Sequence, residues 1–174
     1  QALAACLADR PPRLDLGRPR LSVDRVFTMS GFGTVVTGTL TDGSLQVGDE
    51  LEILPAGLRG RVRGLQSHKR KTERAAAGSR TAVNLGGIDL DQVHCGDIVA
   101  RPGAYRPTRR LDAQLRLLPD ISQPLLHNTE VKFFIAAAEV IARLRLLGAE
   151  QLLPGETGWI QLELREPITA VRGD

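Results

Sequence analysis

The sequence predicts an all-β protein made of two small antiparallel β-barrels in tandem. Short segments in which apolar and polar residues alternate recur along most of the chain, and turns containing Gly, Asp or Pro separate them. No long amphipathic helix interrupts these segments through the first half of the chain. Closing such strands into barrels is the economical arrangement because it leaves no strand edge exposed.

The first barrel is expected over residues 13–102. A tight Gly31-Phe32-Gly33 loop separates the first two alternating segments, and Asp42-Gly43 and Gly48-Asp49 supply the turns that follow. The expected strands are 21–27, 34–40, 44–47, 50–54, 59–65, 80–85 and 97–100.

The second barrel is expected over residues 103–174, because Pro102-Gly103 breaks the pattern before it resumes. The stretch 136–147 has some helical character, yet its β-branched residues and the alternation of Arg143 and Arg145 favour a strand. Only about five strands fit before the sequence ends, so we expect this barrel to be incomplete at its C-terminal end. The four clearest candidate strands are 110–117, 131–135, 141–147 and 159–164.

The two ends predict a piece cut from a longer chain. Leu3, Cys6 and Leu7 have helical spacing, and the Pro11-Pro12 pair ends that helix, so residues 1–12 resemble the tail of a preceding domain and a linker. Arg172-Gly173-Asp174 follows an unfinished strand pattern and is interpreted as a turn.

Composition limits the class of protein. Of 174 residues, 42% are apolar and 25% charged, which is typical of a folded globular protein. Cys6 and Cys95 suit neither a disulfide framework nor a metal site, so a reducing cytoplasm is the expected location. The longest apolar runs, such as 133–138, are far shorter than the ~20 residues that span a bilayer. No membrane partner is expected.

Catalytic constellations are absent from the sequence. It contains no Ser/His/Asp, Cys/His or paired-carboxylate arrangement, no Walker A phosphate loop and no dinucleotide fingerprint. His68, His94 and His127 lack metal-ligand spacing. We therefore expect neither catalysis by this chain nor a metal or cofactor bound to it.

Positive charge is concentrated between Gly57 and Arg80. This segment holds eight basic residues and one acidic residue, a net charge of +7 in a chain whose total is +3. Such a concentration indicates a phosphate-bearing partner, although a solvated strand-loop-strand face is the alternative. Aromatic residues make up only 3% of the chain, so recognition of a nucleic-acid backbone is favoured over base stacking. The residues expected to bind, the first four of them in an exposed loop, are His68, Lys69, Arg70, Lys71 and Arg74.

Arg25 breaks the alternation of its strand. A period of two places it on the same face as Leu21, Val23 and Phe27, so its guanidinium is expected to point with the apolar set. A buried charge needs a partner, which can be Asp24 if the strand bulges, a loop carboxylate, or an anionic ligand. Arg80, at the start of another strand, is a second candidate for the same site.

Several blocks of sequence resemble translational GTPases of the elongation factor Tu class. They are most similar to the selenocysteine-specific branch of that class, over about residues 13–174. The blocks that resemble its second domain are Val23-Asp24-Arg25-Val26-Phe27, Gly31-Phe32-Gly33-Thr34-Val35-Val36-Thr37-Gly38-Thr39-Leu40, Val47-Gly48-Asp49, Gly64 to Lys71, Ala77-Gly78 and Cys95-Gly96-Asp97. Those that resemble its third domain are Glu130 to Val140 and Pro154 to Trp159.

The resemblance implies a function in translation. The complete protein would bind GTP and magnesium through a domain preceding Gln1, and would deliver selenocysteinyl-tRNA to the ribosome with the help of a C-terminal messenger-RNA-binding region. The positions that match the pocket for the selenocysteyl group are Asp24, Arg25 and Arg80. Because a selenol is largely ionised at neutral pH and a serine hydroxyl is not, two guanidiniums can select this group by charge.

Two rival classes remain open. Another translational GTPase, such as an initiation factor gamma-type subunit or a general elongation factor, shares these barrels and binds a different charged tRNA. The large subunit of sulfate adenylyltransferase also carries barrels of this kind. The identity of the aminoacyl-tRNA separates the first class, and nucleotide-sulfate chemistry separates the second.

Overall fold

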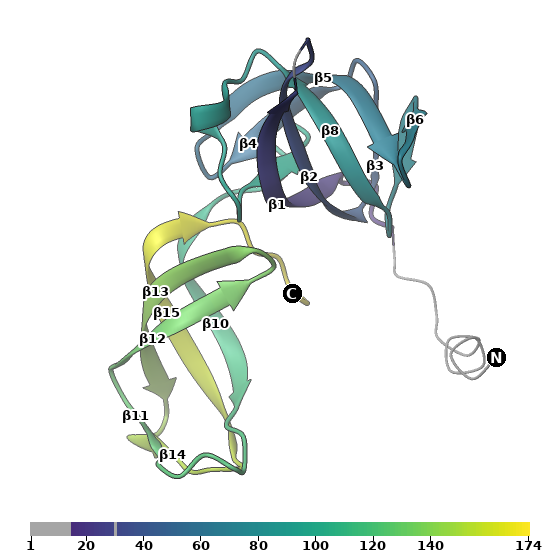
Figure 1. The fold of residues 1–174 in the computed structure, drawn as a ribbon. Helices are drawn as coiled ribbons and strands as arrows, with labels where there is room; N and C mark the ends of the chain where they lie inside the picture. Colours follow the sequence, from purple (N-terminus) through teal and green to yellow (C-terminus); the bar gives the residue numbers. More distant parts are fainter. Residues whose placement is uncertain (1–14, 30) are drawn as a thin grey trace, which may run out of the picture.

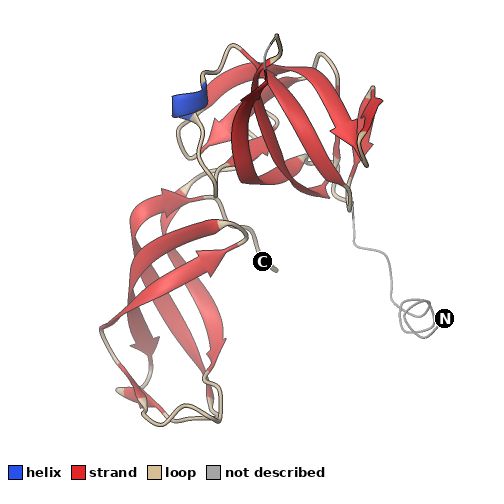
Figure 2. Ribbon diagram, in the orientation of Figure 1, coloured by secondary structure: helices blue, strands red, loops and turns tan. Residues whose placement is uncertain are grey.

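The computed structural model describes residues 15–29 and 31–174, and almost all of its regular structure is β-strand (Figures 1 and 2). Within these residues the one helical element is a single 3-10 turn at Leu90–Gln92. The all-β prediction is therefore confirmed. The helix tail expected at residues 1–12, with Cys6, lies outside the described residues.

Six strands form a closed antiparallel barrel at the N-terminal side (Figure 1). Each of the seven strands expected here is present, six of them differing by one or two residues at an end. The barrel closes because the last strand in the order pairs with the first. In order around the barrel the strands are β4 (Glu50–Leu54), β9 (Ile98–Ala100), β1 (Arg20–Met29), β2 (Gly33–Asp42), β8 (Arg80–Gly86) and β5 (Leu58–Ser67).

The inward-facing side chains of these strands fill the barrel. Leu21, Leu40, Leu51 and Val83 are fully buried and belong to one apolar cluster. They come from four different strands, so the core depends on barrel closure rather than on any single hairpin.

Three short strands lie beside the barrel. β3 (Ser44–Gln46) is one of the expected strands, and it pairs with β7 (Arg74–Ala76), which is not among the strands expected from the sequence. β6 (Arg70–Thr72) pairs with the end of β5, so the prediction that Arg70 and Lys71 lie in a loop is wrong. Segments of three residues are too short to show a period of two, and only pairing with a neighbour reveals them as strands.

The C-terminal part contains a four-stranded antiparallel sheet and a two-stranded ribbon. The strand predicted within 136–147 is confirmed. Alternate side chains of the two central strands, including Ala142, Leu144, Ile160 and Leu162, form a second apolar cluster. In sheet order the strands are β10 (Thr108–Arg116), β15 (Thr157–Ile168), β13 (Ala138–Leu147) and β12 (Thr129–Ile135), and the ribbon is β11 (Leu125–Leu126) with β14 (Gln151–Leu152).

Apolar and charged contacts join the two parts. Tyr105, in the connection after β9, packs with Leu54 and Ile98 of the barrel, and Val171 packs against the same cluster. The buried Arg20 donates from both terminal nitrogens to the carboxylate of Asp174. The segment that follows β15 is thus tied back to the barrel, as the position of the C-terminus in Figure 1 shows.

The hairpin between β12 and β13 reaches the barrel at Gly96. Gly96 has a φ of 96°, and a Cβ atom built on it would lie 2.8 Å from the Cα of Ala138, at the start of β13. Since that contact is with backbone, a larger residue at this position must displace either the turn that contains Gly96 or the start of β13. Gly96 therefore sets how closely the C-terminal sheet approaches the turn at residues 94–97.

We expect Gly96→Ala to separate the two surfaces and destabilise the protein. The matched control is Gly87→Ala, because Gly87 also has positive φ, 81°, but a Cβ there would meet no atom within 4 Å. Both changes place an alanine in left-handed backbone, which destabilises the protein. Only Gly96→Ala also creates a steric overlap with Ala138, so it should lower the free energy of unfolding by about 1–3 kcal/mol more than the control. Urea unfolding measures the difference, and equal losses in the two variants would contradict the contact.

Candidate nucleic-acid interface

A one-residue bulge in β1 sets the direction of Arg25. Val23 pairs with Gly38 and Arg25 with Thr37, so Asp24 is the extra residue between them. The offset moves the inward-facing positions from Val23 to Val26, which packs on the core, and leaves Arg25 exposed. The prediction that the Arg25 guanidinium points with the apolar set is therefore wrong, because strict alternation does not survive a bulge.

The carboxylate of Asp24 is the partner of Arg80. Arg80 donates from Nη2 to Oδ1 of Asp24 at 2.9 Å and from Nη1 to Oδ2, and the hydroxyl of Thr37 donates to Oδ1 at 2.9 Å. β8, which begins at Arg80, lies next to β2, and β2 lies next to β1, so this ion pair crosses the outer side of three strands. Sequence reasoning missed Thr37, whose role depends only on its cross-strand position.

Hydrogen bonds and nearby positive charges lower the pKa of Asp24 by more than its partial burial raises it. Partial burial raises the pKa of this carboxyl, but the hydrogen bonds from Arg80 and Thr37 and the charges of Arg80 and Arg25 lower it, and the net pKa lies below the usual value of 3.8. The hydrogen bonds to Asp24 likewise raise the pKa of Arg80. The site therefore holds one carboxylate and two guanidiniums, a net charge of +1.

The guanidinium of Arg25, unlike that of Arg80, is not held by a carboxylate. Within the described part of the chain, no hydrogen bond or ion pair joins its side chain to another residue, although its charge acts on Asp24. Arg80 has both terminal nitrogens bound to a carboxylate. Of the three site residues predicted from sequence, the structure brings Asp24 and Arg80 into contact and leaves Arg25 beside them facing solvent.

The turn at residues 94–97 supports the bulge. The Val23 amide donates to the Asp97 carbonyl at 2.9 Å, and the Gly96 amide donates to the Val23 carbonyl at 2.8 Å. The thiol of Cys95 donates to the carbonyl of Asp24 itself, at 3.2 Å. Because Gly96 also meets Ala138, this turn links the C-terminal sheet to the site.

The basic hairpin of β5 and β6 lies next to Arg80. His68 and Lys69 form its two-residue turn, with φ values of 50° and 63°. The Ser67 hydroxyl donates to the carbonyl of Arg80 at 3.3 Å, which ties the base of the hairpin to the start of β8. All five residues predicted to bind RNA have exposed side chains, and they are His68, Lys69, Arg70, Lys71 and Arg74.

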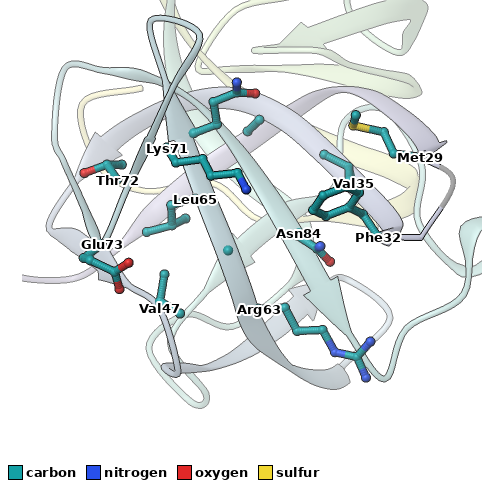
Figure 3. A pocket seen from close by; sticks show the side chains of 13 residues that line it. Met29, Phe32, Val35, Val47, Arg63, Leu65, Lys71, Thr72, Glu73 and Asn84 are labelled. Carbon is teal, nitrogen blue, oxygen red and sulfur yellow. The ribbon is translucent and has the colours of Figure 1, made fainter.

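A pocket of about 280 Å³ opens between the hairpin and the loop after β1 (Figure 3). Met29, at the end of β1, and Phe32, in the loop after it, are both about half exposed and form apolar walls of the pocket. The Lys71 ammonium lies 5.7 Å from the centre of the Phe32 ring. The amide oxygen of Asn84 is buried in this region without a hydrogen-bond partner among the described residues. Sequence reasoning missed this pocket, because an exposed Phe in a Gly-Phe-Gly loop was the single local signal.

Residues 15–29 and 31–174 contain neither a metal centre nor a membrane-spanning helix. No group of three or more His, Cys, Asp or Glu residues in this part of the chain is arranged to hold a metal ion. No helix there is long and apolar enough to cross a membrane.

Comparison with known proteins identifies the barrel. Residues 33–100 match the family model of elongation factor Tu domain 2. The chain is 45% identical to a selenocysteine-specific elongation factor of Desulfomicrobium baculatum over 155 residues, covering 89% of this chain and 24% of the relative. It is 35% identical to elongation factor Tu 2 of Streptomyces avermitilis over 152 residues, covering 85% of this chain and 39% of the relative.

A solved structure agrees on the fold. The crystal structure of a bacterial selenocysteine-specific elongation factor, EF-Sec, superimposes with a TM-score of 0.79 over 99% of this chain and 27% of that one, at 24% identity. The chain thus spans about a quarter of the length of the selenocysteine-specific factors that it matches.

These matches indicate the class of protein: residues 33–100 are similar to domain 2 of elongation factor Tu, a translation factor. Within that class it is similar to selenocysteine-specific elongation factors, and the resemblance predicted from the sequence blocks is confirmed.

We expect the Asp24 carboxyl to titrate below pH 3.8, its unperturbed value, in a carbon-detected NMR titration. Arg80→Gln should raise that pKa because burial then acts without the paired guanidinium, whereas Arg74→Gln, which removes an equal charge elsewhere, should leave it unchanged. Since the pKa is depressed in the folded state, Asp24 stabilises the fold at pH values above that of the unfolded carboxyl. This contribution is lost as the pH falls through the lowered value. An Asp24 pKa that does not respond to Arg80→Gln would contradict the ion pair.

Proposed function

We propose that this chain is the tRNA-binding barrel region of a selenocysteine-specific elongation factor that delivers selenocysteinyl-tRNA to the ribosome in a GTP-dependent manner. The observation that carries the proposal is the meeting of three features along β8. They are the charged site at Arg80, the apolar pocket lined by Ala82 and Asn84, and the basic hairpin bound to Arg80 through Ser67.

Each feature suits one part of a charged tRNA. Exposed cations of the hairpin, such as Lys69 and Arg70, bind backbone phosphates. The pocket between Phe32 and Leu65 accepts the terminal base by stacking. Asp24, Arg25 and Arg80 receive the selenocysteyl group.

The roles of the two arginines differ in this scheme. Arg25, whose guanidinium is uncommitted, supplies charge directly to the selenolate. Arg80 is held by Asp24, so Asp24 orients it and partly neutralises it, and the net charge of +1 matches an anion of charge −1. A seryl group carries no charge for this site to recognise.

GTP and magnesium belong to another part of the complete factor in this proposal. The sequence contains no Walker A loop, the motif that cradles a nucleoside triphosphate in P-loop GTPases. The complete factor would be a cytoplasmic GTPase, and its ribosome and messenger-RNA contacts would involve further regions. The barrels contribute binding rather than hydrolysis.

A general elongation factor or an initiation factor gamma-type subunit is the alternative within the class. The charged site favours the selenocysteine-specific role, as does the higher identity, 45% against 35%, to the relative of that name. A sulfate adenylyltransferase large subunit would instead require nucleotide-sulfate chemistry in the complete protein.

Replacing either arginine tests the selectivity. In the complete, GTP-bound factor, Arg25→Gln and Arg80→Gln should each weaken binding of selenocysteinyl-tRNA roughly tenfold, as expected when a charge-assisted hydrogen bond is removed, and change binding of seryl-tRNA by less than about twofold. Asp24→Asn should reduce selectivity less than either change. Dissociation constants for both tRNAs and the melting temperature are measured for each variant. Equal losses for both tRNAs, with a lowered melting temperature, would show a structural ion pair instead.

Neutralising the hairpin tests the phosphate contacts. Lys69→Gln, Arg70→Gln and Lys71→Gln combined should weaken binding of both aminoacyl-tRNAs alike. The salt dependence of log K should flatten by roughly 0.7–0.9 for each phosphate that is no longer neutralised, because fewer counterions are released. The salt slope is measured by titration over a range of ionic strengths. A slope identical to that of the unmodified factor would leave the hairpin as a solvated surface.

A further inference from the structure

The structure divides the basic segment between two surfaces. Lys69, Arg70 and Lys71 of this segment lie in the hairpin beside Arg80. The N-terminal half of the segment places Arg59, Arg61 and Arg63 on β5, with all three side chains exposed and buried or half-buried residues between them. These three residues are here called the β5 arginine row. Arg63 also borders the apolar pocket, whereas Arg59 and Arg61 do not line it.

The β5 arginine row makes no close ion pair with the neighbouring strand. Arg59 and Arg61 lie opposite Glu52 and Glu50 of β4, yet no ion pair within 4 Å joins a carboxylate to any of the three arginines in the described residues. Glu52 instead accepts a hydrogen bond from the Gly103 amide at 2.9 Å. The guanidiniums therefore remain available to an anionic partner.

A groove of about 340 Å³ runs beside the row. Arg59 and Arg61 line it, and Gly60 and Gly86 leave it without side chains at two positions. A Cβ atom on Gly86 would lie 2.7 Å from Nε of Arg63, so the glycine lets the Arg63 side chain lie across the strand beside the groove. Glu50 lines the same groove and opposes anion binding there.

The spacing of the row selects the kind of anion. Alternate residues of a strand lie roughly 6.6–6.8 Å apart, which is close to the separation of successive phosphates along one nucleic-acid strand. No aromatic residue lines the groove, so it offers no platform for unpaired bases. Recognition through backbone phosphates, without base contacts, is the mode used for double-stranded RNA.

We propose that the β5 arginine row binds the phosphate backbone of an RNA duplex, separately from the surface that holds the aminoacyl end of tRNA. This inference rests on the proposed function for its choice of RNA as the polyanion. The row occupies the half of β5 remote from the Ser67 hairpin. Arg63 borders the apolar pocket, and in Figure 3 its guanidinium points away from the other labelled side chains of that pocket.

The test uses the 174-residue chain and a labelled, blunt RNA duplex of about 16 base pairs, a length that double-stranded RNA-binding domains span. Arg59→Gln, Arg61→Gln and Arg63→Gln combined should lower duplex affinity about tenfold or more and flatten the salt slope by about 2–3. Glu50→Gln should strengthen binding. The matched control combines Arg106→Gln, Arg116→Gln and Arg143→Gln, three exposed arginines that lie beyond the barrel, and should have little effect.

Several results would overturn the proposal. An equal loss of duplex affinity in the control would indicate attraction by net charge alone. Unchanged duplex affinity in the row variant would also contradict the proposal. So would binding to phosphatidylserine vesicles that depends on the row, without binding to the duplex. A row variant that weakens aminoacyl-tRNA binding by the complete factor as strongly as the Lys69, Arg70 and Lys71 variant would make the row part of the tRNA site. Failure of the proposed function can be distinguished from failure of this inference. The first would appear as unchanged aminoacyl-tRNA binding in the variant with Lys69, Arg70 and Lys71 replaced, whereas the second would appear in binding of the RNA duplex.

Discussion

The candidate interface depends on the ion pair between Asp24 and Arg80. These residues are 56 positions apart in the sequence, and three strands must be in register for the guanidinium to reach the carboxylate. The bulge at Asp24 is part of that register, because it turns the carboxylate toward β8 and Arg25 toward solvent. An offset of one residue would place a different side chain opposite Arg80.

The site is supported from the C-terminal sheet as well as from the barrel. The turn at residues 94–97 holds the bulge through backbone hydrogen bonds, and its glycine touches the first residue of β13. Arg20 and Asp174 hold a second point of the same junction. A shift of the C-terminal sheet would therefore act on Asp24 through this turn, which gives the second sheet a physical influence on a site built from the first barrel.

Most positive charges of the basic segment lie along the outer face of β5 and in the hairpin that follows it. β5 presents arginines along its outer face and then turns into the hairpin that carries Lys69, Arg70 and Lys71, so one continuous basic segment serves two regions of the surface. Aliphatic side chains of the same strand, such as Val62 and Leu65, fill the core. This alternation lets a strand contribute to folding and to binding at once, without burying charge.

The sequence by itself determined the strands, the net charge of the basic segment and the class of the protein. Alternation and turn residues are local properties, so strands such as 50–54 were placed correctly, and the Gly-Thr-Val-Val-Thr-Gly block identified the translation-factor class. The directions of Arg25 and of the hairpin residues were decided only by the tertiary structure. A bulge, a three-residue strand and an ion pair across three strands depend on contacts between residues distant in sequence, which no local period encodes. The apolar pocket and the division of the basic segment exist for the same reason, since each is formed where separate strands meet.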